Sequence, residues 1–205
     1  MNETKQKILD VALDLFSQKG FSAVSIRDIC KVVDIKESSV YYHFKNKQAI
    51  FDELLQHFET IANDLMSQLE QGLMVMPPPD NFEGNFFEKT CDCFFEDYLM
   101  DEYCNKIMRL LSIEHLHNEE MQKIYDYWMF DKPLSFQTKV FSVLTAAGII
   151  EAADSHYLAV KFYAPIFLYM QRWLFCGALT EECKQTFREN AYRHVNHFFH
   201  EIGTE

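Results

Sequence analysis

The sequence predicts an all-helical protein. Only six of its 205 residues are glycine and five are proline, so the residues that separate short strands are scarce. Apolar residues recur at helical spacing throughout the chain, and 48% of all residues are hydrophobic, which is ample for a buried core. These observations argue against a β-sandwich, an α/β sheet or a disordered chain.

The formal net charge of −12 is unevenly distributed along the chain. Residues 1–47 hold eight Lys and Arg against six Asp and Glu, a net of +2, whereas the other residues hold eleven against twenty-five, a net of −14. An acidic body behind a basic N-terminal segment suppresses unspecific adhesion to nucleic acid. An acidic surface that serves only solubility is the alternative.

The first helix is expected at about Thr4–Lys19, where Ile8 and Phe16 belong to a buried stripe. Gly20 is expected to end this helix, with Phe21 folding back onto it.

A short second helix is expected from Ser25 to Val33. Ser25 is a good N-cap, and Asp28 stands at the reciprocal capping-box position. Asp34 tolerates the left-handed conformation that a tight turn between two helices requires.

A third helix is expected at about Lys36–Phe44, with Val40 and Phe44 facing the core. Its opposite face carries hydroxyls, tyrosines and a histidine, which suit contacts with phosphates and base edges better than packing. Surface aromatics that merely cover the helices are the alternative. The predicted DNA-binding residues are Ser25, Arg27, Lys36, Ser38, Ser39, Tyr41, Tyr42, His43 and Lys47.

Lys47 follows Asn46, a good N-cap, at the start of the next expected helix. A cation at a helix N-terminus opposes the helix dipole. A DNA phosphate bound there would explain the placement, because the free amides and the ammonium would share one anion.

Residues 4–55 resemble the helix-turn-helix domain of the TetR family of transcriptional regulators, above all in the run from Val40 to Lys47. Asp34 stands where the family usually has Gly, and Lys36-Glu37 replaces a commoner Ser-Lys pair. The resemblance implies a TetR-like fold in which a long helix joins the DNA-binding domain, residues 1–47, to a helical ligand-binding and dimerisation domain, residues 48–205.

Further helices are expected along the rest of the chain, with a loop at Pro77–Asn81. Pro133 is expected to open a helix, and Asp154 and Thr180 to begin the last two. The expected ranges are 48–72, 83–100, 102–113, 119–129, 133–147, 154–176 and 181–202.

The last two helices are long and rich in apolar residues, as in half of a dimer bundle. A two-fold pair of recognition helices binds a palindromic operator with the summed free energy of both half-sites. The sequence therefore predicts a homodimer, with Leu158, Ile166, Met170, Trp173, Phe187, Ala191, Val195 and Phe198 as dimerisation residues.

Nineteen Phe, ten Tyr and nine Met form a heavy aromatic and sulfur content that suits an apolar ligand cavity, although ordinary core packing is the alternative. The predicted ligand is small and hydrophobic or aromatic. The predicted ligand-binding residues are Phe94, Tyr98, Met108, Leu111, Tyr125, Trp128, Met129, Phe136, Phe162, Phe167 and Met170.

Neither a metal nor a cofactor is predicted. His194, His197 and His200 follow successive three-residue steps round one helix and do not converge on a tetrahedral site. Cys91 and Cys93 point apart on a helix, which is poor for chelation, so both are expected to be core cysteines. Reduced thiols, no signal peptide and no membrane segment indicate a cytoplasmic protein.

The sequence lacks the common catalytic motifs, so no enzymatic activity is predicted. The predicted function is a repressor released from DNA by its ligand. One alternative is a DNA-binding regulator that a protein partner controls or that activates transcription. Another is a helical enzyme or binding module.

Overall fold

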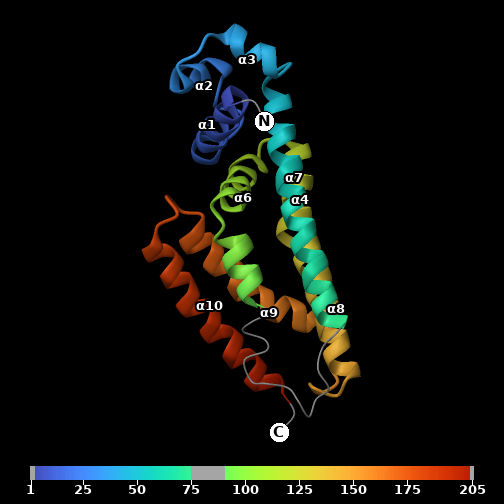
Figure 1. Ribbon diagram of the computed structural model, residues 1–205. Coiled ribbons are helices and arrows are strands. Elements are labelled where there is room, and N and C mark those ends of the chain that lie inside the picture. Colours follow the sequence, from blue (N-terminus) through green and yellow to red (C-terminus); the bar gives the residue numbers. More distant parts are fainter. Residues whose placement is uncertain (1–2, 75–90, 204–205) are drawn as a thin grey trace. The chain divides into compact units, whose positions relative to one another are not determined.

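The computed structural model describes residues 3–74 and 91–203, and most of these residues are helical, which confirms the predicted all-α class (Figure 1). The expected loop at Pro77–Asn81 lies outside the described residues. The α-helices are α1 (Glu3–Lys19), α2 (Ile26–Val33), α3 (Glu37–His43), α4 (Lys47–Met74), α6 (Glu102–Glu114), α7 (Glu119–Asp126), α8 (Lys132–Ala146), α9 (Ser155–Tyr169) and α10 (Glu181–Ile202). Stretches of π-helix occur at η2 (Phe95–Leu99), η3 (Tyr127–Asp131) and η4 (Met170–Leu174).

The chain forms two compact units. The first comprises Met1–Ala62 with Glu102–Tyr125, and the second comprises Asn63–Asp101 with Asp126–Glu205. Helix α4 therefore supplies residues to both units. The boundary that the sequence places after residue 47 falls within the first unit and stays a prediction.

The first unit is built around α1, which packs against α2, α3 and α6. Figure 1 shows α1, α2 and α3 gathered beside the start of α4. Phe16 and Phe51 are almost completely buried, and the ring of Phe21 lies 5.3 Å from the ring of Phe16 and 5.4 Å from that of Phe51. Burying side chains of this size stabilises the unit by about 2 kcal/mol each.

Two residues in left-handed conformation fix the turns of the first unit, as the sequence predicts. Gly20 has a φ of 84° directly after α1, and its amide donates to the carbonyl of Phe16. Asp34 has a φ of 62° between α2 and α3, a conformation that a short polar side chain tolerates.

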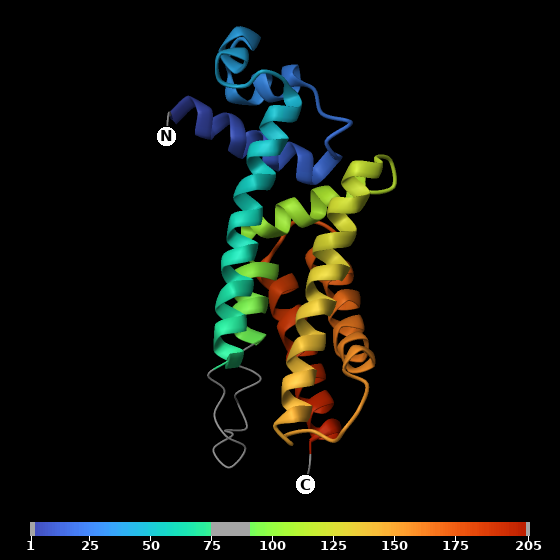
Figure 2. The ribbon, with the colours of Figure 1, turned by 90° about the vertical axis from the view of Figure 1, so that its right-hand side faces the viewer.

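In the second unit, α9 packs against both α8 and α10 (Figure 2). Phe141 on α8 lies 5.9 Å from Phe162 on α9 and 5.5 Å from Phe198 on α10, measured between ring centroids. The hydroxyl of Tyr163 donates to the carbonyl of Met129, so its one buried polar group is satisfied.

Pro133 stands in the first turn of α8, as predicted, although α8 follows α7 directly through η3. The amide of Lys132 bonds to the carbonyl of Tyr127, five residues earlier, which forms a wider turn just before the proline. Asp154 and Thr180 cap α9 and α10 with their side chains, as predicted. None of the helices in the described chain is long and apolar enough to span a membrane.

Candidate DNA-binding site and core cavity

Helix α2 is held at its N-terminus by short-range capping. The hydroxyl of Ser25 accepts from the amide of Asp28 at 3.2 Å, and the Asp28 carboxylate accepts from the amide of Ser25 at 2.8 Å. The hydrogen bonds from Ser25 lower the pKa of Asp28, because they favour its charged form. Ser25, predicted to contact DNA, is thus engaged as an N-cap, although it remains exposed.

The face of α3 opposite the core presents polar and aromatic groups. Tyr42 is 83% exposed and Tyr41 is 52% exposed, whereas Val40 is fully buried. Ser38, Ser39, Tyr42 and His43 line one shallow surface depression together with Thr4 of α1. The structure therefore brings these four predicted DNA-binding residues together on one surface.

The other predicted contacts surround this surface. Lys36 is exposed and precedes α3 as its N-cap residue, without a side-chain capping bond. Arg27 on α2 pairs with Glu37 at the start of α3, with 2.9 Å between Nε and Oε1.

Lys47 has a different position from the one expected. Its ammonium donates to the carbonyls of Phe21 and Val24, both at 2.7 Å, and lies 4.2 Å from the centroid of the Phe21 ring. Partial burial lowers the pKa of Lys47. The two carbonyl groups therefore offset the unfavourable interaction of the Lys47 ammonium with the dipole of α4. Through these bonds Lys47 holds the turn between α1 and α2. As correctly expected, the side chain of Asn46 caps α4, by accepting from the amide of Ala49.

Glu114, at the end of α6, holds the same turn from another side. Its carboxylate is buried and accepts from the amide of Ser22 at 2.8 Å and from the Ser22 hydroxyl at 2.7 Å. A Cβ atom on Gly20 would lie 2.4 Å from Oε1 of Glu114, so α6 approaches this closely only beside a glycine. We call residues 20–24 the gripped turn. Sequence reasoning missed Glu114, because no local signal links residues so far apart in the chain.

A cavity of about 50 Å³ lies in the second unit. Phe94, Phe136 and Phe162, three of the predicted ligand-binding residues, line it, and their binding of a ligand stays a prediction. Phe95 also lines the cavity, and sequence reasoning missed the other lining residues, which are Met66, Leu69, Cys91, Pro133, Gln137, Val140 and Phe199. The lining contains no charged residue, and the amide of Gln137 is its main polar group.

The remaining predicted ligand-binding residues do not line this cavity. Met108, Leu111 and Tyr125 are buried in the first unit, and Phe167 is partly exposed beside Phe130. Tyr98, Trp128, Met129 and Met170 are buried core residues of the second unit. Aromatic and Met residues fill ordinary core as well as ligand sites, and residue type alone does not separate the two uses.

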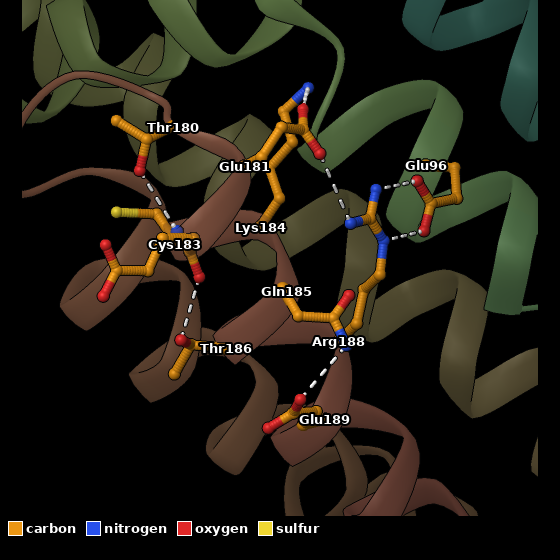
Figure 3. Close-up of polar contacts among 10 residues, drawn as sticks. Glu96, Thr180, Glu181, Cys183, Lys184, Gln185, Thr186, Arg188 and Glu189 are labelled. Carbon is orange, nitrogen blue, oxygen red and sulfur yellow. Dashed lines mark hydrogen bonds and ion pairs between the residues drawn. The ribbon is translucent and has the colours of Figure 1, made fainter.

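One wall of the cavity is attached to α10 by polar contacts. Arg188 donates from Nε and Nη2 to the two carboxylate oxygens of Glu96, at 2.6 and 2.7 Å (Figure 3). The hydrogen bond from Arg188 holds the pKa of Glu96 below its ordinary value. The hydroxyl of Tyr192 donates to Asp92. These contacts hold the segment 91–99, which carries the cavity residues Phe94 and Phe95.

The predicted dimerisation residues are also corrected. Leu158, Ile166, Met170, Phe187, Ala191, Val195 and Phe198 are buried within the single chain, and only Trp173 is partly exposed. The apolar stripe of each helix packs first into the core of its own chain. Helix α9 instead exposes a second stripe, with Tyr157 at 64%, Val160 at 40% and Leu168 at 60% exposure.

The histidines and cysteines form no metal cluster in the described part of the chain. The ring of His194 is half-buried, with Nε2 2.8 Å from the carbonyl oxygen of Phe162, and burial lowers its pKa. The expectation that Cys91 and Cys93 are core cysteines is wrong, because both are partly exposed. Cys30 and Cys104 are buried, and Cys176 is exposed.

The N-terminal part of the chain matches a known protein family. Residues 8–54, which span most of α1 through the first turns of α4, match the family model of bacterial regulatory proteins, tetR family. Residues 8–54 are therefore similar to the N-terminal domain of the tetR family of bacterial regulatory proteins.

Two relatives and two solved structures are similar to this chain over longer stretches. The negative transcriptional regulator IcaR of the biofilm operon icaADBC, from Staphylococcus aureus strain Newman, is 26% identical over 201 residues, which cover 95% of this chain and 98% of IcaR. The uncharacterized HTH-type transcriptional regulator YerO of Bacillus subtilis is 30% identical over 127 residues, 62% of this chain and 42% of YerO.

The solved structures show the fold. A TetR-family regulator from Agrobacterium tumefaciens matches with a TM-score of 0.67 at 20% identity, covering 98% of both chains. SmeT, the repressor of the Stenotrophomonas maltophilia multidrug efflux pump SmeDEF, matches with a TM-score of 0.65 at 18% identity, covering 100% of this chain and 92% of SmeT. The chain therefore has the fold of these TetR-family structures.

Proposed function

We propose that the chain forms a homodimer that represses transcription from a palindromic operator and leaves the DNA when a small apolar ligand binds. The observation that carries the proposal is the surface of α3, where Tyr42 and its polar neighbours are exposed opposite the buried Val40. The name of IcaR as a negative regulator supports the sign of regulation. A regulator of bacterial DNA acts in the cytoplasm, where we place this chain.

DNA recognition uses α3 as the helix that enters the major groove. In helix-turn-helix proteins the second helix reads base edges and the first crosses the backbone. Ser38, Ser39, Tyr42 and His43 are the groups that reach bases or phosphates, and the exposed ammonium of Lys36 adds a phosphate contact.

Dimerisation uses the exposed stripe of α9. Tyr157, Val160 and Leu168 are too exposed to belong to the core of one chain, and a second copy would remove them from water. Leu168→Glu is expected to shift the protein from dimer to monomer in sedimentation velocity. Leu116→Glu is the matched control, because Leu116 is 78% exposed in the first unit. Equal behaviour of the two variants would contradict this interface.

The cavity between Phe94, Phe136 and Phe162 is the proposed ligand site. Its volume of about 50 Å³ is well below the roughly 300 Å³ of a typical small-molecule pocket, so a ligand must displace aromatic side chains to enter. The uncharged lining favours a neutral apolar or aromatic molecule with one polar group for Gln137, because an ion would lose its hydration without a partner.

The gripped turn couples ligand binding to DNA binding. Lys47 on α4 and Glu114 on α6 both bond to this turn, which leads from α1 into α2. A displacement of α4 or α6 therefore reorients α2 and α3. A ligand that binds the displaced state more tightly shifts the population away from the DNA-binding state by its differential affinity.

The test is a comparison of two exposed tyrosines. Tyr42→Ala is expected to weaken operator binding at least about tenfold, because a good base or phosphate contact is worth this much. Tyr127→Ala, in the second unit, removes a tyrosine that is 42% exposed and is expected to leave operator binding unchanged. Equal operator affinities for both variants would overturn the assignment of α3.

A second candidate mode of control is a protein partner in place of a small molecule. The small size of the cavity favours it, because the core is nearly filled. A screen of neutral apolar compounds, scored by release of a fluorescent operator, separates the two modes. Release by a compound that also raises the melting temperature supports the ligand. Release only by a cell extract whose activity is destroyed by protease supports the partner.

A further inference from the structure

The DNA-facing pair of helices carries an exposed ion pair that the proposed contacts do not explain. Arg27 on α2 and Glu37 on α3 are joined by a bond of 2.9 Å from Nε to Oε1, with their side chains 83% and 42% exposed. Exposed ion pairs contribute little to stability. The two helices are already fixed by the capping box of Ser25 and by the buried Ile29 and Val40. The pair is therefore dispensable for the fold.

The negative charge of Glu37 weakens the electrostatic attraction of this surface to DNA. Its carboxylate stands one residue before Ser38 and would face a surface of phosphates, which repel it. A carboxylate that accepts but does not donate hydrogen bonds finds partners in the major groove only in the amino groups of cytosine and adenine. The remaining acceptor atoms of the groove repel it.

Arg27 supplies the complementary chemistry beside that carboxylate. A guanidinium donates two hydrogen bonds to N7 and O6 of guanine, while the cytosine paired with it offers an amino group. The pair of donor and acceptor, held together before DNA arrives, matches the pattern of one G·C base pair. Because Glu37 already holds Arg27 in place, the Arg27 side chain loses less conformational freedom when DNA binds.

We infer that Arg27 and Glu37 form a preassembled reader of a G·C base pair, in which Glu37 determines specificity at the expense of affinity. The inference rests on the proposed function, because it needs an operator. Glu37 rejects DNA whose groove presents acceptors at this position, and it weakens binding to unspecific DNA.

The experiment selects operators from random duplexes with the full-length wild type, Glu37→Gln, Arg27→Ala and the double variant. Asp10→Asn is the charge-matched control, because Asp10 is an exposed carboxylate on α1 that accepts a hydrogen bond from Gln6 within its own helix. The wild type and the control are expected to select the same palindrome, with G·C at one symmetric position of each half-site.

Glu37→Gln is expected to lose roughly tenfold in discrimination at that position, and its affinity for unspecific DNA is expected to rise about two- to fivefold. Arg27→Ala is expected to relax the same position or its immediate neighbour. The double variant should lose no more discrimination than the worse single variant, because the two side chains act as a unit.

The outcomes separate this inference from the proposed function. If the folded wild-type dimer selects no sequence, both fail. If the wild type selects an operator and Glu37→Gln selects the same one with unchanged unspecific affinity, the reader is wrong, and the pair is an ordinary surface ion pair on a working regulator.

Discussion

The carboxylate of Glu114 accepts hydrogen bonds from both the amide and the hydroxyl of Ser22, at 2.8 and 2.7 Å. These residues are 92 positions apart, one at the end of α6 and the other in the turn between α1 and α2. Hydrogen bonds to a charged group are among the stronger contacts in a protein. The turn that leads into α2 is therefore attached to α6 at a defined point, which is the basis of the proposed coupling.

Glu114→Ala is expected to lower the free energy of unfolding by roughly 1–3 kcal/mol, because charge-assisted hydrogen bonds contribute about this much. Glu114→Gln keeps one acceptor oxygen and should lose less. Urea denaturation of both variants measures the difference. An Ala variant as stable as the wild type would show that the bonds to Ser22 contribute nothing.

Gly20→Ala and Gly148→Ala form a matched pair. Both residues have positive φ, 84° and 72°, so both substitutions introduce backbone strain of about 1 kcal/mol. Only the Cβ at position 20 would collide with Glu114, since no atom of the described residues lies within 4 Å of the one at position 148. Operator affinity is expected to fall for Gly20→Ala alone. A comparable loss of affinity for both variants would indicate strain and not the clash.

Arg188→Ala is expected to loosen segment 91–99 and so open the cavity. Faster amide hydrogen exchange at η2 and stronger binding of an apolar fluorescent dye measure the effect. Arg193→Ala is the control, because Arg193 is exposed on the same helix. Since Arg188 lowers the pKa of Glu96, the stabilisation by this pair should be present above pH 4.5, the ordinary value, and lost as the pH falls through the lower folded value. Exchange rates that match those of the control would exclude this role.

His194 is expected to make stability depend on pH. Burial lowers its pKa below the ordinary value of 6.5, so the unfolded chain binds the proton more readily than the folded chain. Stability should be full above pH 6.5 and should decrease as the pH falls through the folded pKa. Thermal unfolding of His194→Gln should show a flatter dependence over this range. His200→Gln, at an exposed position of the same helix, should keep the slope of the wild type.

Features encoded within a few residues could be predicted from the sequence. The capping box of Ser25 and Asp28, the left-handed Asp34 and the N-cap Thr180 are all present, because each depends on a side chain bonding to its own neighbourhood. The exposure of Tyr42 also follows from helical spacing alone.

Contacts between distant segments could not be predicted in this way. Leu158 and Leu168 lie on the same helix and are the same residue type, yet one is buried and the other is 60% exposed, because the positions of α8 and α10 decide which face is covered. For the same reason the sequence predicts a DNA phosphate beside Lys47, whereas in the structure its ammonium donates to two carbonyls of the gripped turn. The assignment of individual residues to DNA stays a prediction.

The most direct test of the central claim, sequence-specific DNA binding by a dimer, is enrichment of genomic fragments on the purified protein at physiological salt, where unspecific binding is weak. The expected result is one palindrome, with half-site centres separated by about one or more turns of DNA. A folded dimer that enriches no sequence, with and without the apolar compounds of the ligand screen, would contradict the claim.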